Sequence, residues 1–220
     1  MADFASLREA MVARQIAARG VTGAALLAAM REVPREAFVS EKLAAQAYDD
    51  MPLPIEAGQT ISQPYIVALM IEAAGIAPGH HVLEIGAGSG YAAAVIGRIA
   101  CTVIAIERHA ELAALAASRM RRLGYGNVTI VEGDGSAGWP EGAPYDAILA
   151  AASGSHVPDL LRRQLRPGGG ILVMPIGGPG AIQSLVKVVR LGEGDYQDEH
   201  LGAVRFVPLI GAQGWGESSA

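Results

Sequence analysis

The sequence predicts an α/β protein built on a doubly wound, mostly parallel sheet, with helices on both faces of the sheet. The first observation is a strand, a tight turn and a helix in direct succession over residues 82–98. The second is that apolar runs of strand length alternate with helical patterns along the rest of the chain. The third is that 51% of the 220 residues are hydrophobic, which is enough for one real core.

The first 64 residues have the pattern of a helical cap followed by a loop. Residues 4–19 carry apolar side chains at helical spacing, and Thr22 is placed to cap a second short helix. Prolines and a glycine punctuate residues 48–64, and loops of this length are usually functional or disordered. No linker-like tract follows, so we expect a single domain with the cap and loop over 1–64 and the core over 65–220.

The remaining elements follow in order along the chain. After the first strand and turn, helices are expected at 89–98, 110–122 and 158–165, and strands at 102–106, 127–131, 145–150 and 171–174. Two late extended runs, 184–191 and 204–209, are expected to close the sheet as an antiparallel pair. Ligands on such sheets bind at the carboxyl ends of the strands, near the point where the strand order reverses.

The turn after the first strand predicts a nucleotide-binding site. Its glycines follow a G-x-G-x-G spacing, with Gly86, Gly88 and Gly90 leading into a helix and Glu84 two residues before the first of them. Glycine lets a ligand approach the backbone, and the helix start offers unpaired N–H groups. The arrangement resembles the first motif of class I methyltransferases, and Glu107 closes the next apolar run, where an acid can accept both ribose hydroxyls. The alternative is a glycine-rich turn that binds nothing.

Two further positions carry candidate binding residues. Ser62 precedes a helix that is expected to start at Pro64, and a helix N-terminus favours a bound carboxylate. The alternative is that Ser62 or Gln63 only caps that helix. Asp134 stands in a glycine-flanked turn at the end of a strand, where it can accept a hydrogen bond from an adenine amino group. The alternative is an Asp that caps its own turn.

The charge, the cysteine content and the apolar runs of the sequence argue against several classes of protein. A net charge of −5 and a pI near 5.5 argue against binding to nucleic acid, which usually requires a basic face. Cys101 is the sole cysteine, and no Cys/His spacing is typical of a metal site. The sequence shows neither a signal peptide nor a long uncharged apolar run. We therefore expect a soluble, cytoplasmic, monomeric protein that uses no metal and contacts neither nucleic acid nor membrane.

Seven segments, in matching order and over nearly the whole length, resemble the protein-L-isoaspartate (D-aspartate) O-methyltransferase family. The segments are residues 33–39, 53–55, 59–65, 82–91, 133–135, 144–148 and 204–209. The glycine motif is shared by many methyltransferases. The Gln-Thr-Ile-Ser-Gln-Pro run and the Gly-Asp-Gly run, with its Trp and Pro-Tyr-Asp tail, are far more specific to this family.

The resemblance implies a Rossmann-like methyltransferase that transfers a methyl group from S-adenosylmethionine to the free carboxylate of L-isoaspartyl and D-aspartyl residues in damaged proteins and peptides. It implies that Ser62 orients the acceptor carboxylate and is the catalytic residue. The implied substrate contacts are Thr60, Ile61, Ser62, Val204, Arg205, Phe206 and Val207. The expected cofactor contacts are Glu84, Gly86, Ala87, Gly88, Ser89, Gly90, Glu107, Arg108, Gly133, Asp134 and Gly135.

The chain departs from the family pattern at three places, one of which is Ala151, where many members have threonine. Glu56 stands where members often have glycine, and residues 153–156 replace a more apolar turn, so the peptide context that the enzyme prefers is not predicted. A carboxylate with a pKa near ~4 is already ionised, so no general base is needed and no His/Asp pair is expected. Two alternatives stay open: a methyltransferase of the same scaffold acting on ordinary aspartate, and a non-catalytic S-adenosylmethionine-binding module.

Overall fold

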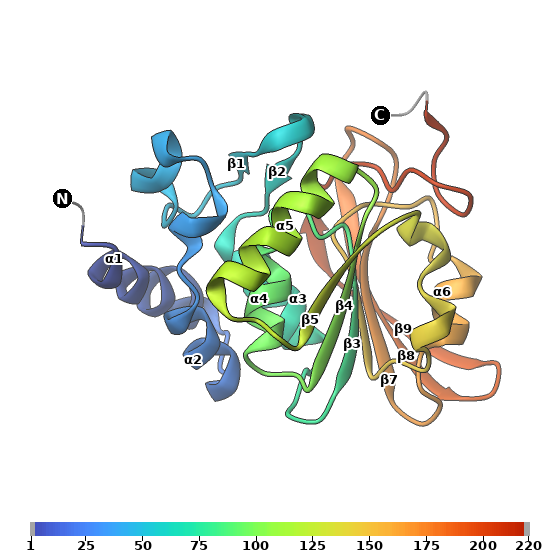
Figure 1. Cartoon of the computed structure of the whole chain (residues 1–220). Coiled ribbons are helices and arrows are strands. Elements are labelled where there is room, and N and C mark those ends of the chain that lie inside the picture. Colours follow the sequence, from blue (N-terminus) through green and yellow to red (C-terminus); the bar gives the residue numbers. More distant parts are fainter. Residues whose placement is uncertain (1–2, 218–220) are drawn as a thin grey trace.

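A computed structural model describes residues 3–217 of the chain and places a seven-stranded sheet between two layers of helices (Figure 1). The strand order is β5-β4-β3-β6-β7-β8-β9. The strands are β3 (His81–Ile85), β4 (Thr102–Glu107), β5 (Val128–Glu132), β6 (Ala147–Ala150), β7 (Gly170–Ile176), β8 (Gln183–Gly192) and β9 (Asp195–Val204). The first five are mutually parallel and the last two pair antiparallel, as the sequence predicted.

The order of the strands fixes where a ligand can bind. The chain runs outward from β3 through β4 to β5 and then returns to the other side of β3 as β6. The connections on the two sides of β3 therefore diverge at the carboxyl ends of β3 and β6. Such a switch point leaves a crevice in parallel α/β sheets.

Helices cover the two faces of the sheet unequally. On one face lie α3 (Pro64–Ala73), α4 (Tyr91–Gly97) and α5 (Ala110–Leu123), and on the other lies α6 (Asp159–Gln164), with the short turns η6 (Gly135–Ala137) and η7 (Pro140–Gly142) before it (Figure 1). Within residues 3–217, no helix has both the length and the apolar character needed to cross a membrane.

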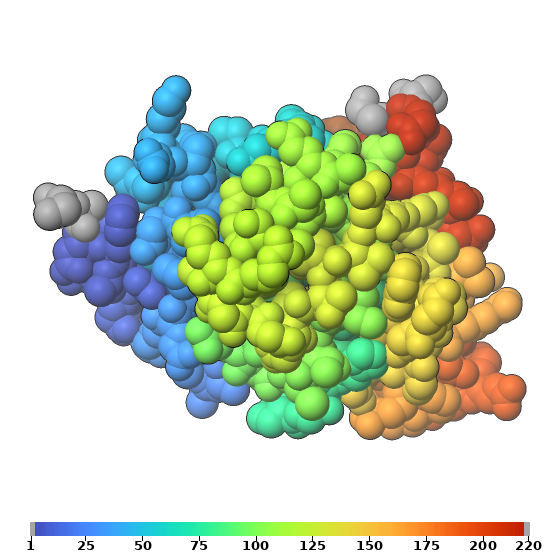
Figure 2. Space-filling view, viewed as in Figure 1, coloured from blue at the N-terminus to red at the C-terminus, as the bar shows by residue number. Residues whose placement is uncertain are grey.

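The N-terminal helices form a cap on the α3–α4 side of the core. They are α1 (Phe4–Ala10), a π-helical turn η1 (Met11–Ile16), η2 (Ala17–Arg19), α2 (Ala24–Glu32), η3 (Arg35–Phe38) and η4 (Glu41–Gln46). Met11 and Met30 of the cap share one buried cluster with Val95 of α4. On the face that Figure 2 shows, the cap, in blue, meets the green core as a continuous surface.

The loop after the cap is an ordered hairpin. Its strands, β1 (Leu53–Pro54) and β2 (Thr60–Ile61), pair antiparallel, and η5 (Glu56–Gly58) forms the tip. Helix α3 then begins at Pro64, the predicted residue. Since Pro64 has no N–H to lose, it fits the first turn of the helix.

Two local predictions were wrong. Residues 204–209 are not the partner of β8, because β9 (Asp195–Val204) takes that place. The edge strand β9 exposes most of its residues and so lacks the apolar run that marks a buried strand. Thr22 does not cap α2 either, since the N-cap is Gly23 and the Glu72 carboxylate accepts hydrogen bonds from the N–H groups of Thr22 and Gly23 at 2.9 and 3.1 Å.

Candidate active site

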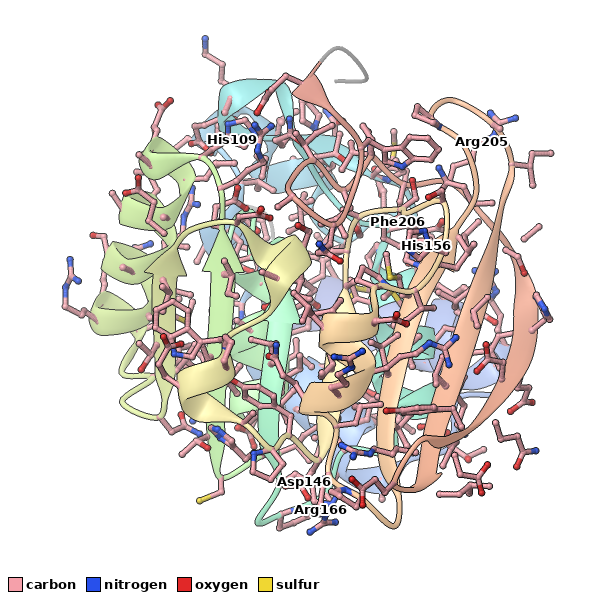
Figure 3. The ribbon with its side chains drawn as sticks, turned by 90° about the vertical axis from the view of Figure 1, so that its right-hand side faces the viewer. His109, Asp146, His156, Arg166, Arg205 and Phe206 are labelled. Atoms are coloured by element: carbon pink, nitrogen blue, oxygen red, sulfur yellow. The ribbon has the colours of Figure 1, made fainter. Side chains whose placement is uncertain are left out.

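A groove of about 900 Å³ lies at the carboxyl ends of the central strands. Its walls are the β1–β2 hairpin and the residues after it, the glycine turn after β3, the end of β4, and the segment that follows β9. Figure 3 shows His109, Phe206 and Arg205 toward this end of the sheet, with Asp146 and Arg166 at the opposite end. The volume is in the range of sites that bind cofactors and small molecules.

The glycine turn has the close-approach geometry that the sequence predicted. Gly88 has φ 53° and Gly90 has φ 88°, a left-handed region that side chains other than glycine rarely adopt. A Cβ on Gly90 would lie 2.9 Å from Met120 of α5, and a Cβ on Gly88 would face Ile55 of the hairpin at 3.5 Å. The turn is therefore packed from behind by α5 and faces the hairpin from the front.

Glu107 ends β4 and holds two turns together. Its carboxylate accepts hydrogen bonds from the N–H groups of Gly88 at 2.8 Å and His109 at 2.9 Å. The side chain is 5% exposed and lines the groove. Because a carboxylate has about four acceptor sites, Glu107 keeps capacity for donors of a bound ligand, such as ribose hydroxyls.

Glu84 is a buried acid with one carboxylate oxygen that lacks a partner among residues 3–217. It lies on β3 at the floor of the groove, is 2% exposed, and its Oε2 makes no hydrogen bond with any of residues 3–217. Burial raises the pKa of the Glu84 carboxyl to about 8, the charge of Glu107 acts in the same direction, and a contact with the Ala93 backbone lowers the pKa by less. An unpaired buried acid is costly, so this position favours a ligand that brings a cation or a hydrogen-bond donor.

Asp134 is not among the residues that line the groove, and its carboxylate accepts hydrogen bonds from backbone N–H groups. Its Oδ1 accepts from the N–H of Ser136 at 2.8 Å, and its Oδ2 accepts from the N–H of Ala212 at 2.7 Å. Partial burial raises the pKa of Asp134, but the hydrogen bonds from Ala212 and Ser136 outweigh it and leave the pKa below its ordinary value. The Asp thus caps its own turn, and it also anchors the segment near the C-terminus.

Ser62 lines the groove just before α3 and does not cap that helix. Asp50 performs the capping, since its carboxylate accepts from the Tyr65 N–H at 3.3 Å and from the Gln63 amide at 2.7 Å. The backbone carbonyl of Ser62 accepts from the guanidinium of Arg35 at 2.8 Å. Neither anchor uses the Ser62 hydroxyl, and Ser62 lines the groove two residues before the start of α3.

Arg35 is a site-positioning residue that sequence reasoning did not single out. It is completely buried, donates to the carbonyl of Ala47 at 2.8 Å as well as to Ser62, and lies over the ring of Tyr91 at 4.7 Å. Tyr91 is the first residue of α4, directly after the glycine turn. The one guanidinium therefore joins the cap, the hairpin and the glycine turn. Its only sequence signal was its place in residues 33–39, which the family resemblance includes.

All of the predicted substrate residues line the groove, and so do most of the predicted cofactor residues. Lining the groove are Thr60, Ile61, Ser62, Val204, Arg205, Phe206, Val207, Glu84, Gly86, Ala87, Gly88, Ser89, Glu107, Arg108 and Gly135. Gly90, Gly133 and Asp134 are not among the lining residues. Residues 204–207 form a wall of the groove, although only Val204, the last residue of β9, belongs to the sheet.

Asp146 belongs to a segment of the family pattern but does not lie at the site. Its carboxylate pairs with Arg166 at 2.8 Å and accepts from the His81 N–H at 2.7 Å, at the amino ends of β3 and β6. Figure 3 places Asp146 and Arg166 at the far end of the sheet from Phe206. This pair therefore fixes strand packing and takes no part in the groove.

The family model described as protein-L-isoaspartate(D-aspartate) O-methyltransferase (PCMT) matches residues 6–214. A relative from Rhodopseudomonas palustris named protein-L-isoaspartate O-methyltransferase is 58% identical over 205 residues, which cover 93% of this chain and 94% of the relative. A relative from Pelobacter propionicus, named protein-L-isoaspartate O-methyltransferase 2, is 56% identical and the match covers 94% of this chain and 92% of the relative.

Solved structures agree with this similarity. A structure named protein-L-isoaspartate O-methyltransferase superposes with a TM-score of 0.85 at 31% identity, covering 94% of this chain and 67% of that chain. A Plasmodium falciparum structure in complex with S-adenosyl-L-homocysteine has a TM-score of 0.79 at 24% identity and covers 92% of this chain and 98% of that one, which supports the fold. The similarity in sequence and in fold thus extends over nearly the whole chain.

Proposed function

The chain belongs to the protein-L-isoaspartate (D-aspartate) O-methyltransferase family, and we propose that its groove holds a methyl donor at the glycine turn and an isoaspartyl carboxylate at Ser62. The reaction is methyl transfer from S-adenosylmethionine to the free carboxylate of isoaspartyl residues, the first step in repair of damaged proteins. What we propose is the role of each residue of this chain in the reaction, together with the oligomeric state and the cellular compartment of the enzyme.

The donor side of the groove fits the chemistry of the cofactor. S-adenosylmethionine, when bound, supplies a methyl group on a positively charged sulfur. Glu84, whose Oε2 has no partner among residues 3–217, would accept from its ammonium group. Glu107 would accept from the ribose hydroxyls, with Arg108 beside it, and the backbone of residues 86–90 would pack against the methionine portion. The buried Oε2 of Glu84, which lacks a partner among residues 3–217, is the observation that best supports this assignment.

The role of Asp134 needs a separate argument, because its carboxylate already accepts two hydrogen bonds from the backbone. We propose that its carboxylate still reaches the adenine edge, with the backbone of residues 133–135 beside it. Two of its acceptor positions are used by Ser136 and Ala212, and a carboxylate has further lone pairs to offer. Gly135, which lines the groove, supports a cofactor position next to this turn.

The acceptor side needs orientation and no base. The isoaspartyl carboxylate is ionised at neutral pH, so one of its oxygens can form the new bond to the methyl carbon while the carbon–sulfur bond breaks and its electron pair stays on sulfur. No proton moves in this step. The Ser62 hydroxyl would donate to the other carboxylate oxygen, and the backbone of residues 60–62 would hold it at the start of α3.

The walls contribute by positioning the reactants and excluding water. Ile61 is 4% exposed, and Phe206 lies half-buried on the other side of the acceptor site. Alignment of two reactants in this way can lower a barrier by about 7–11 kcal/mol at best. Since the nucleophile already exists in solution, we expect alignment to supply most of the rate enhancement.

The test is methylation of two synthetic peptides that differ only in isoaspartate versus aspartate, using a radiolabelled donor. Repair predicts strong labelling of the isoaspartyl peptide and little labelling of the other. A preference for ordinary aspartate would reject repair in favour of a dedicated peptide substrate. Donor binding by calorimetry without any methyl transfer would identify a non-catalytic binding module.

We also infer that the enzyme acts as a monomer in the cytoplasm on proteins and peptides, without nucleic acid or membrane. The single cysteine and the net charge of −5 support this setting. The whole length acts as one methyltransferase domain in this proposal, because the cap and the core share a buried cluster. Gel filtration with light scattering at assay concentration tests the monomer.

A further inference from the structure

We propose that Gln183 is a positioning residue for the methyl acceptor, because its side-chain amide fixes the wall formed by residues 204–207. The proposal rests on the proposed function, in which this wall contacts the isoaspartyl peptide. Gln183 does not line the groove. It is the first residue of β8 and is 2% exposed.

The Gln183 amide hydrogen-bonds both backbone polar groups of a single wall residue. Its Oε1 accepts from the Phe206 N–H at 2.7 Å, and its Nε2 donates to the Phe206 carbonyl at 3.0 Å. Nε2 also donates to the Ser153 hydroxyl at 2.9 Å and lies 3.4 Å from the Gly178 carbonyl. This two-sided contact is the pattern that a neighbouring antiparallel strand makes with one residue.

The wall needs this support because the sheet ends at Val204, the first residue of the wall. The last backbone pair of β8 and β9 joins Gln183 to Val204, and beyond Val204 the chain leaves the ladder. Buried backbone N–H and carbonyl groups require partners. On one side the Gln183 amide supplies them, and on the other Ser153 donates its N–H to the Val207 carbonyl at 2.8 Å and accepts from the Leu209 N–H at 2.8 Å.

The position of Phe206 sets the width of the acceptor site. Phe206 lines the groove and also a small cavity of about 30 Å³ that Ser62 and Glu84 share with it. A shift of the Phe206 backbone would therefore change the space between the wall and Ser62, where the acceptor carboxylate must lie. Because this wall contacts the peptide in the proposed function, such a shift would weaken peptide binding and so raise KM for the acceptor.

The main test replaces the amide with groups of similar size. Gln183→Met removes every polar contact, and we expect KM for the isoaspartyl peptide to rise about 10-fold or more while kcat changes less than about 2-fold. S-adenosylhomocysteine affinity should stay unchanged, because the glycine turn does not touch Gln183. Ser184→Ala is the matched control, since Ser184 is the next residue on β8 and bonds His200 outside the groove.

Gln183→Glu adds a second measurement, the pH dependence of KM, which should not change if Gln183 only stabilises the fold. The ionised carboxylate can accept from the Phe206 N–H but faces the Phe206 carbonyl without a proton, whereas the protonated acid can donate to it. The ratio of variant to wild-type KM should therefore fall as the pH is lowered from about 8 to about 5.5, where the substrate carboxylate stays ionised. A ratio that does not change with pH would contradict the proposal.

The outcomes separate this inference from the proposed function. If the wild-type protein does not prefer the isoaspartyl peptide, the proposed function fails. If it does, and Gln183→Met leaves KM within about 2-fold of wild type or lowers cofactor affinity as much as peptide affinity, the role of Gln183 is rejected. Should Gln183→Met not fold, Ser153→Ala, which removes one contact of the amide, must raise KM by about 2–5-fold at unchanged cofactor affinity.

Discussion

The carboxylate of Glu56 lies 3.5 Å from the guanidinium of Arg119, so the tip of the β1–β2 hairpin is tied to α5 across the glycine turn. Arg119 also donates to the carbonyl of Ser89, within that turn, at 3.3 Å. The Arg119 side chain is 12% exposed and the Glu56 side chain 33%. A single arginine therefore links the wall of the acceptor site to the backbone that faces the donor.

Removing this ion pair should speed the release of the cofactor product. In Glu56→Gln the hairpin loses its charged contact with α5, and a pair of this exposure contributes at most about 1 kcal/mol. We expect S-adenosylhomocysteine to dissociate about 2–5-fold faster at low salt, measured by stopped-flow fluorescence. The difference should shrink in about 0.5 M salt, because exposed charges are screened.

The control for that experiment is Glu41→Gln, which removes an exposed carboxylate outside the groove. Equal release rates for Glu56→Gln and the wild type at low salt would show that the pair does not restrain the hairpin. A rate increase of the same size at both salt concentrations would point to a packing change instead of a lost charge pair.

Ser62→Ala should slow methyl transfer and leave the cofactor bound as before. A hydrogen bond to a charged oxygen contributes about 1.5–3 kcal/mol, so kcat/KM for the isoaspartyl peptide should fall about 10- to 100-fold. The Kd of S-adenosylhomocysteine, measured by calorimetry, should change less than about 2-fold. Ser118→Ala, on the exposed side of α5, is the matched control, and an equal loss of both parameters in Ser62→Ala would assign Ser62 a structural role.

Glu84→Gln should stabilise the cofactor-free protein at high pH. The ordinary pKa is 4.5 and the folded pKa is about 8, so the unfolded state ionises first. Wild-type stability contributed by this group is therefore greatest below pH 4.5 and falls as the pH rises toward 8. In chemical denaturation at pH 5, 7 and 8.5, the free energy of unfolding of the variant relative to that of the wild type should increase by a few kcal/mol across that range. Glu199→Gln controls for the loss of one surface charge.

The same acid predicts a proton released on cofactor binding. An ammonium group beside Glu84 favours the ionised form, so the wild-type carboxyl, protonated at pH 7 in the empty site, should lose its proton when S-adenosylhomocysteine binds. Calorimetry in two buffers with different ionisation enthalpies measures this proton. Glu84→Gln should bind more weakly and release less, whereas equal proton release by the variant and the wild type would place the ammonium group elsewhere.

Features encoded by local sequence were predictable, and features that depend on distant contacts were not. The glycine turn and Glu107 follow from spacing within a single strand–turn–helix unit, and both lie in the groove. Gln183 could not be identified, because its partner Phe206 is 23 residues away and a glutamine at the start of a strand has no distinctive pattern. Likewise β9 was missed because its exposed residues do not alternate with a buried face.

Asp134 caps its own turn, the alternative that the sequence left open, and it also makes a distant contact that the sequence did not indicate. The segment near the C-terminus is held by two hydrogen bonds. The Asp134 carboxylate accepts from the Ala212 N–H at 2.7 Å, and the Ser136 hydroxyl accepts from the Gln213 N–H at 2.9 Å. The Trp215 indole in turn donates to the Ser153 carbonyl at 2.9 Å. Both Asp134→Ala and Ser136→Ala should therefore loosen the segment, which tryptophan fluorescence quenching reports.

The two variants should differ in cofactor affinity, because only Asp134 carries the carboxylate proposed for the adenine edge. Asp134→Ala should weaken S-adenosylhomocysteine binding about 10-fold or more with kcat largely preserved at saturating donor, whereas Ser136→Ala should change the Kd less than about 2-fold. An equal loss in both would assign the effect to the segment they anchor. Unchanged affinity in Asp134→Ala would leave the carboxylate with the backbone of residues 136 and 212 as its only partners, and the adenine edge would need another acceptor.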